Sequence, residues 1–246
     1  MALIEEFRKQ GNYLFRYRSF FPVPVLIVGI LVYVLPRARG YEPYSPEWLE
    51  PIYFLVGIAG LIVRSLVVGF TPRGTSGRNR EQQIADSLNT RGMYNMVRHP
   101  LYVGNFLMWF SCALLTENFW FIISFVFFFW VYYERIMFAE EFFLREKFGD
   151  VYLSWSEKVP AFIPAKIQWI KPDAVFSFRN VIRREYYGVF SLITVFTFFD
   201  VIEQAFSRRE INWFSPWMLA FIVSLLLTLV IRTLIKNTRL FSVEGR

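Results

Sequence analysis

Residues 119–138 read FWFIISFVFFFWVYYERIMF, an apolar run long enough for an α-helix to cross a membrane. A helix covers a hydrocarbon core of about 30 Å with about 20 residues. Five further apolar runs lie along the chain, at residues 20–35, 53–70, 101–115, 186–206 and 213–235. The run at 101–115 is short and joins 119–138 through a three-residue connection, as in a helical hairpin. The sequence therefore predicts an all-α integral membrane protein with about six transmembrane helices.

The composition supports this class and excludes several others. Apolar residues make up 55% of the chain and charged residues only 19%, below the roughly 25% of an average soluble domain. The single cysteine, Cys112, excludes a disulfide framework and a cysteine-rich metal site. The single histidine, His99, excludes a site that needs two imidazoles. We therefore expect no metal and, because of the spans, no nucleic acid as a partner.

The Lys and Arg residues are distributed unevenly between the two sides of a six-helix arrangement. Arg64 lies inside a span, and 22 of the other 26 fall on the side of the N-terminus, in residues 1–19, 71–100, 134–185 and 232–246. Segments rich in Lys and Arg stay in the cytoplasm. Both termini and the two long polar loops are therefore expected in the cytoplasm, and the chain in a bacterial inner membrane. We interpret residues 1–246 as one membrane domain, with a core at about 50–165 and a two-helix extension at about 166–246.

One polar segment stands directly before the run at 101–115. It reads Arg98-His99-Pro100-Leu101-Tyr102-Val103-Gly104. Pro100 suits the first position of a helix, whose free N–H groups and dipole then favour a carboxylate or phosphate near His99. Tyr102 offers a ring and a hydroxyl, and Gly104 allows close approach of a ligand or of another helix. Taken alone, the segment is better explained as a capped helix with a lone surface histidine.

A second polar segment follows the run at 119–138. Glu140 and Glu141 begin it, and apolar residues then recur at helical spacing as far as Trp155. This pattern predicts an amphipathic helix that continues the span and is broken near Gly149. The adjacent carboxylates could hold an ammonium group or ribose hydroxyls; the alternative is an ordinary charge pattern on a surface helix.

Together, the two segments resemble the isoprenylcysteine carboxyl methyltransferase family and its relatives among membrane phospholipid methyltransferases. The family patterns Arg-His-Pro-x-Tyr-x-Gly and Glu-Glu-x-x-Leu-x-x-x-Phe-Gly-x-x-Tyr are matched by Arg98, His99, Pro100, Tyr102 and Gly104, and by Glu140, Glu141, Leu144, Phe148, Gly149 and Tyr152. The resemblance covers residues 70–165, and residues 71–79 are similar to bacterial members. It implies that S-adenosylmethionine binds on the cytoplasmic side, held by Arg98, His99, Pro100, Tyr102, Gly104, Glu140 and Glu141.

Two arginines lie near the same membrane face and are the predicted catalytic residues. Arg64 precedes the end of its run by six residues, about 9 Å at 1.5 Å per residue, and Arg135 lies near the end of the run at 119–138. Arg binds oxyanions in a fork, although each side chain could instead snorkel to the interface. The resemblance implies an acceptor-holding arginine four residues before Glu140, where this chain has Ile136. Arg135 lies about 100° away around the helix, which permits a different acceptor.

The chemistry of methyl transfer favours an anionic acceptor. An anionic oxygen needs cations but no general base, which suits a chain with one histidine. An amine would require a base and a pocket for the growing cation. We therefore predict an S-adenosylmethionine-dependent methyltransferase that acts on an oxygen of a membrane lipid or lipidated substrate. The acceptor is a lipid phosphate, such as the 1-phosphate of lipid A, or a prenyl or lipid carboxylate.

Three other functions compete with this prediction. An NADPH-dependent membrane reductase of the sterol-reductase type has a related cofactor-binding core, but the Glu140–Glu141 pair argues against it. A phospholipid amine N-methyltransferase is the second. A transporter or scaffold is the third, and no polar path across the spans supports it.

The basic stretch at 166–185 either retains its loop in the cytoplasm or attracts an anionic lipid headgroup. Asp200 and Glu203, near the outer end of their span, are predicted to be structural and to pair with Arg208 or Arg209.

Overall fold

The computed structural model describes residues 2–41, 46, 48–72, 83–208 and 210–243. Within these ranges the chain is all-α and has no strand. The elements are α1 (Leu3–Tyr17), α2 (Pro22–Ala38), α3 (Leu49–Phe70), the 3₁₀ turn η1 (Gly92–Asn95), α4 (Pro100–Leu114), α5 (Phe119–Phe148), α6 (Asp150–Ser156), α7 (Phe178–Glu203), the π-helical turn η2 (Gln204–Arg208) and α8 (Pro216–Asn237).

Each of the six apolar runs forms a helix, so the predicted class of multi-pass, all-α membrane protein is confirmed. In the described residues, α3, α5, α7 and α8 are long and apolar enough to cross a membrane. The pair α1 and α2 would make a fifth span, broken by a bend of 75°, and α4 is short at 15 residues. The number of six spans remains a prediction.

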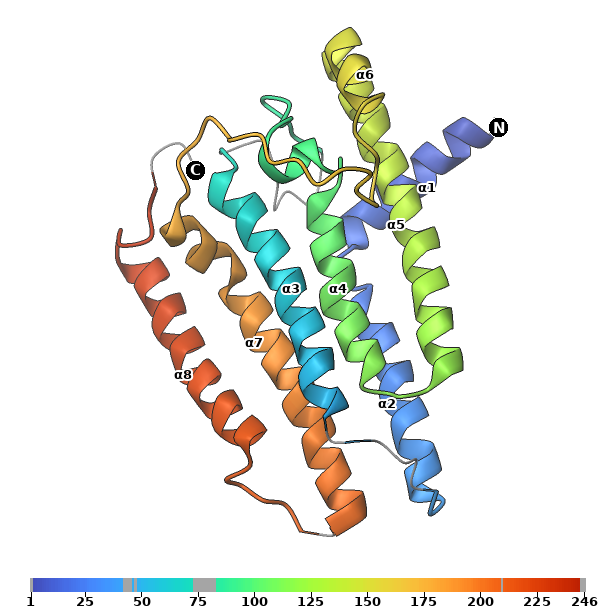
Figure 1. The fold of residues 1–246 in the computed structure, drawn as a ribbon, viewed down its shortest axis with the longest axis vertical. Helices are drawn as coiled ribbons and strands as arrows, with labels where there is room; N and C mark the ends of the chain where they lie inside the picture. The colour runs from blue at the N-terminus through green and yellow to red at the C-terminus, as the bar shows by residue number, and fades with distance from the viewer. Residues whose placement is uncertain (1, 42–45, 47, 73–82, 209, 244–246) are drawn as a thin grey trace.

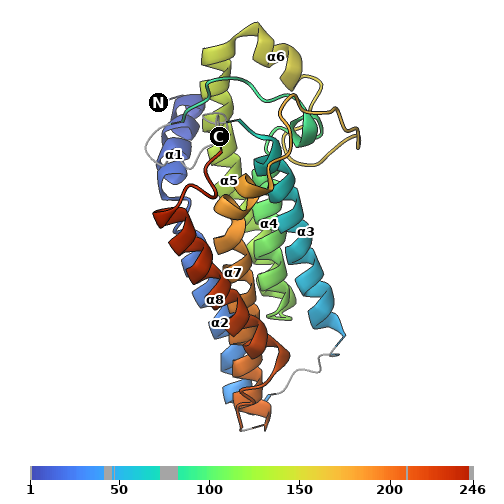
Figure 2. The ribbon, with the colours of Figure 1, turned by 90° about the vertical axis from the view of Figure 1, so that its left-hand side faces the viewer.

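The helices form an elongated bundle whose two ends differ. Both described termini, α6 and the described parts of the two long connections lie at one end, and the connections between α4 and α5 and between α7 and α8 lie at the other (Figures 1 and 2). The segments rich in Lys and Arg therefore gather at one end. That this end faces the cytoplasm remains a prediction.

Glycines and aromatic rings pack the bundle. A Cβ atom on Gly60 of α3 would lie 2.6 Å from the carbonyl oxygen of Gly104 on α4, so α3 and α4 touch backbone to backbone at this point. Between α4 and α5 the core is aromatic and includes Phe125, Phe129 and Tyr133. Some of the 29 phenylalanines thus fill the bundle core, and others, such as Phe127 and Phe128, face outward.

The helix α1 is a feature that the apolar runs do not predict. Its sequence mixes charged and apolar residues, so only one of its faces is apolar. That face lies along α5, where Gly11 packs against the backbone of Arg135 and the side chain of Ala139. An ion pair of 3.1 Å between Arg8 and Glu146 closes the same contact. The chain then turns through residues 18–21 before α2, and this turn borders the cavity described below.

At the far end of the bundle, the two acidic residues of α7 have partners in the fold. Glu203 accepts hydrogen bonds from Tyr33 (2.6 Å) and Arg37 (2.7 Å) of α2. Asp200 accepts from Gln204 and Ser215. The predicted pairing with Arg208 or Arg209 falls on side chains outside the described residues.

Candidate active site

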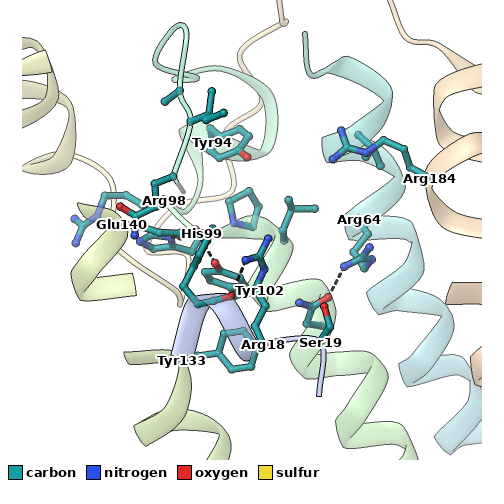
Figure 3. Close-up of a pocket in the computed structure, with 18 of the residues that line it drawn as sticks. Arg18, Ser19, Arg64, Tyr94, Arg98, His99, Tyr102, Tyr133, Glu140 and Arg184 are labelled. Atoms are coloured by element: carbon teal, nitrogen blue, oxygen red, sulfur yellow. Dashed lines mark hydrogen bonds and ion pairs between the residues drawn. The ribbon is translucent and has the colours of Figure 1, made fainter. Parts of the chain in front are cut away.

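A cavity of about 680 Å³ lies near the end of the bundle that holds both termini (Figure 3). Its walls come from the turn after α1, from α3, α4, α5 and α7, and from the segment that precedes α4. Six of the nine predicted site residues line it: Arg64, Arg98, His99, Pro100, Tyr102 and Glu140. Gly104, Glu141 and Arg135 are not on its walls.

The chain after α6 holds the first motif, the segment from Arg98 to Gly104, in place. Gly149 has a φ of +53°, which breaks α5 from α6 as predicted and turns the chain back toward α4. The backbone N–H groups of Arg98 and His99 then donate to the carbonyl oxygens of Pro160 (2.9 Å) and Ala161 (3.1 Å). Residues far apart in the sequence thus hold the segment that leads into α4, and Pro100 begins that helix as expected.

Arg98 and Glu141 bind each other instead of facing the cavity together. The Nε and Nη2 atoms of Arg98 donate to the two oxygens of Glu141 at 2.8 and 3.1 Å. Its Nη1 donates to the carbonyl oxygens of Ser156 and Val159, each at 2.8 Å. This fork joins α5, the end of α6 and the first motif, so it holds the wall of the cavity together.

Glu140 is the carboxylate of the pair that faces the cavity. It accepts a hydrogen bond of 2.7 Å from the hydroxyl of Tyr102, and its other oxygen lies 3.5 Å from Nδ1 of His99. The Nε2 atom of His99 lies 2.8 Å from Glu141. Burial alone lowers the pKa of His99, but the two carboxylates outweigh it and raise the pKa above its ordinary value. The two motifs therefore meet in one network around a histidine that favours its charged form.

Arg64 lines the cavity and is already paired. Its Nε and Nη2 atoms donate to the carboxylate of Glu185 on α7 at 2.7 and 2.9 Å, and its Nη1 donates to Asn105. A Cβ atom on Gly104 would lie 2.5 Å from Cγ of Arg64. Gly104 thus allows α3 and α4 to pack closely and leaves room for the Arg64 side chain. The sequence allowed close approach of a ligand or of another helix, and the structure shows the approach of a helix.

Arg135 lies elsewhere. Its guanidinium stacks at 3.6 Å over the ring of Phe7 on α1 and donates to the neighbouring Glu134 at 2.7 Å. The reason is rotational: α1 occupies the face of α5 on which Arg135 stands, while Ile136 is fully buried in the core. The structure does not bring the two predicted acceptor-holding arginines together.

Sequence reasoning missed two charged residues on the cavity wall, Arg18 in the turn after α1 and Glu185 near the start of α7. Arg184, beside Glu185, also lines the cavity and belongs to the basic stretch at 166–185; Figure 3 shows Arg18 and Arg184. The available signal was position: Glu185 is a carboxylate directly before the run 186–206, on the same predicted membrane face as Arg64. Because only Lys and Arg were counted on that side, this single carboxylate was not considered.

The comparisons with known proteins match the part of the chain that contains both motifs. Residues 53–151, which contain α3, α4 and α5, match the phospholipid methyltransferase family. The protein-S-isoprenylcysteine O-methyltransferase of Schizosaccharomyces pombe is 35% identical over 56% of this chain and 65% of its own length. A cobalt-zinc-cadmium resistance protein of Cupriavidus metallidurans is 25% identical over 64% and 68%. The Xenopus laevis protein-S-isoprenylcysteine O-methyltransferase is 28% identical over 48% and 41%.

These matches are partial. The chain spans 65% of the S. pombe protein and 41% of the X. laevis protein, less than two thirds of each. No solved structure matches the chain significantly. The resemblance that the two motifs carry is nevertheless confirmed: residues 53–151 match the phospholipid methyltransferase family, and the chain is similar to isoprenylcysteine methyltransferases.

Proposed function

We propose that this chain is a membrane methyltransferase that uses S-adenosylmethionine to methylate an oxygen of an anionic membrane amphiphile. One observation carries the proposal. Glu140 and Tyr102, one from each motif, meet on the wall of a cavity that three further arginines line: Arg18, Arg64 and Arg184. The cavity thus offers a carboxylate for an ammonium group and cations for an oxyanion.

The residues present fit the cofactor. A volume of about 680 Å³ falls in the range of roughly 300–1,000 Å³ typical of ligand sites. Glu140 suits the ammonium group. The N-terminus of α4, where Leu101 supplies the first N–H, suits the carboxylate. Burial raises the pKa of the Tyr94 phenol on the same wall, so its hydroxyl stays protonated and able to donate.

The cofactor, when bound, supplies a methyl group on a sulfonium centre. The chain's own residues then have to position the acceptor oxygen near 3 Å from that carbon and keep water out, since most of the gain comes from positioning. Arg64 is placed to hold an oxyanion. The backbone pairing that fixes Arg98 and His99 to the chain after α6 closes one wall. Arg135, which stacks on Phe7, holds α1 against α5 in this proposal.

The charges favour an oxygen acceptor over an amine. A methylated amine must lose a proton, which calls for a base in the cavity. His99 is a poor candidate because its two ring nitrogens already face Glu140 and Glu141. The lining arginines outnumber the lining glutamates, Glu140 and Glu185. A carboxylate such as that of a prenylated cysteine, or a lipid phosphate, needs no base and can be held by the arginines. We place the cavity on the cytoplasmic face because segments rich in Lys and Arg, which favour the cytoplasm, lie at the same end of the bundle (Figure 1).

Two titrations test the proposal. Purified protein is titrated with S-adenosylhomocysteine and, separately, with NADPH, and thermal stabilisation is measured in each series. We expect S-adenosylhomocysteine to raise the unfolding temperature and NADPH to leave it unchanged. Stabilisation by NADPH alone would instead indicate a reductase.

A further inference from the structure

Helix α7 lies outside the segment that matches the family, and yet it forms a wall of the cavity. The match ends at residue 151, whereas α7 begins at Phe178. The start of α7 is tied to the end of α3: the N–H of Ser177 donates to Gly69 at 2.9 Å, and the side chain of Asn180 donates to Val68 at 2.6 Å. The position of α7 relative to α3 is therefore fixed at the level of the cavity.

Glu185 is the buried charge that α7 contributes. Its side chain is 4% exposed, and both oxygens accept from Arg64. Taking a carboxylate out of water is costly, and replacing a buried ion pair by apolar residues of similar size is often neutral or stabilising. Stability alone therefore explains this pair poorly.

The pair leaves part of Arg64 available on the cavity side. A guanidinium has five N–H groups, and the contacts to Glu185 and Asn105 account for three of them. One N–H on each terminal nitrogen, Nη1 and Nη2, is left over. Arginine can bind a carboxylate or phosphate in a fork through these two nitrogens. The Arg64 side chain is 23% exposed and lies on the cavity wall. Partners on α4 and α7 thus fix the plane of a guanidinium that α3 carries.

We propose that Glu185 is a positioning residue that holds Arg64 ready to bind the oxyanion of the acceptor. The two-helix extension is then part of the acceptor site and helps to select the substrate. This inference rests on the proposed function for the identity of the reaction, but the binding of the anion can be measured without the cofactor.

The test compares three variants of the full chain with the wild type. Glu185→Gln removes the charge and keeps the shape. The double variant Arg64→Met with Glu185→Leu replaces the pair by apolar residues. Glu203→Gln serves as the matched control. It removes a carboxylate at the other end of α7, where Glu203 pairs with Arg37 of α2. Binding of N-acetyl-S-farnesylcysteine and of vesicles containing phosphatidate is measured without cofactor, beside thermal stability and S-adenosylhomocysteine binding.

We expect the wild type to bind one of the two anionic probes, and this probe identifies the acceptor as a carboxylate or a phosphate. Glu185→Gln should weaken that binding about tenfold or more, because the Arg64 guanidinium would lose the charge that orients it, and a tenfold change needs only about 1.4 kcal/mol. The double variant should stay folded and bind the probe as weakly, while S-adenosylhomocysteine binding and the Glu203→Gln control stay unchanged.

The inference is overturned by wild-type probe affinity in Glu185→Gln or in the double variant, or by a wild type that binds neither probe. Failure of the proposed function looks different. In that case the wild type does not bind S-adenosylhomocysteine, and the loss of probe binding in the variants still supports the role of Glu185.

Discussion

Glu140 and Glu141 are neighbours in the sequence, and the structure predicts that their substitution has different consequences. Glu141 accepts three hydrogen bonds, two from Arg98 and one from His99, if His99 donates through Nε2. Each bond to a charged group contributes about 1.5–3 kcal/mol. Glu141→Gln keeps one acceptor oxygen and presents an amide N–H to donors, so we expect it to cost about 2–3 kcal/mol of stability. At roughly 2–4 °C per kcal/mol, the unfolding temperature should fall by about 4–12 °C.

Glu140→Gln should behave in the opposite way. Its amide oxygen still accepts from Tyr102, so the unfolding temperature should change little. The charge that faces the ammonium group of the ligand is lost, which corresponds to about ten- to hundredfold weaker S-adenosylhomocysteine binding. Thermal unfolding and equilibrium binding on the same preparations measure both effects. Equal loss of stability in the two variants, or wild-type binding by Glu140→Gln, would refute the separate roles.

Three further predictions follow from the geometry. Arg135→Ala should keep acceptor turnover within about twofold of the wild type, whereas Arg64→Ala should lose most of it; the reverse order in an activity assay would contradict the placement of Arg135. Because its neighbours raise the pKa of His99, the stabilisation that it gives is complete below its ordinary pKa of about 6.5 and is lost as pH rises through the folded pKa. Unfolding temperatures at increasing pH should show this loss in the wild type and not in His99→Asn. Gly104→Ala places a Cβ atom 2.9 Å from a backbone oxygen and should cost about 1–3 kcal/mol in denaturation experiments, while Gly188→Ala, whose nearest contact is a leucine methyl at 3.3 Å, should cost less.

The parts of the structure that sequence could predict are those governed by the membrane. Within a bilayer each span must satisfy its own backbone hydrogen bonds, so every apolar run became a helix. The break at Gly149 was predictable in the same way, since it is coded locally and glycine readily adopts a positive φ. That both motifs lie at the same end of the bundle also followed from the direction of their spans.

The parts that sequence could not predict depend on how helices rotate and pair. The spacing of Arg135 gives its depth in the membrane, but which neighbour it faces is decided by α1, a helix too charged to be detected as an apolar run. The fork between Arg64 and Glu185 joins residues 121 positions apart. Local periodicity carries no information on such a pairing, because it arises when α3 and α7 pack.

Transfer of a labelled methyl group from S-adenosylmethionine, followed by chemical identification of the product, tests the central claim most directly. The purified protein is supplied with N-acetyl-S-farnesylcysteine, phosphatidate and phosphatidylethanolamine in vesicles. The proposed function predicts label in a methyl ester, on the carboxylate or on the phosphate. Label on the nitrogen of phosphatidylethanolamine would contradict the claim that the acceptor is an anionic oxygen, and a protein that binds S-adenosylhomocysteine but transfers no label to any of the three would contradict the acceptor class as a whole.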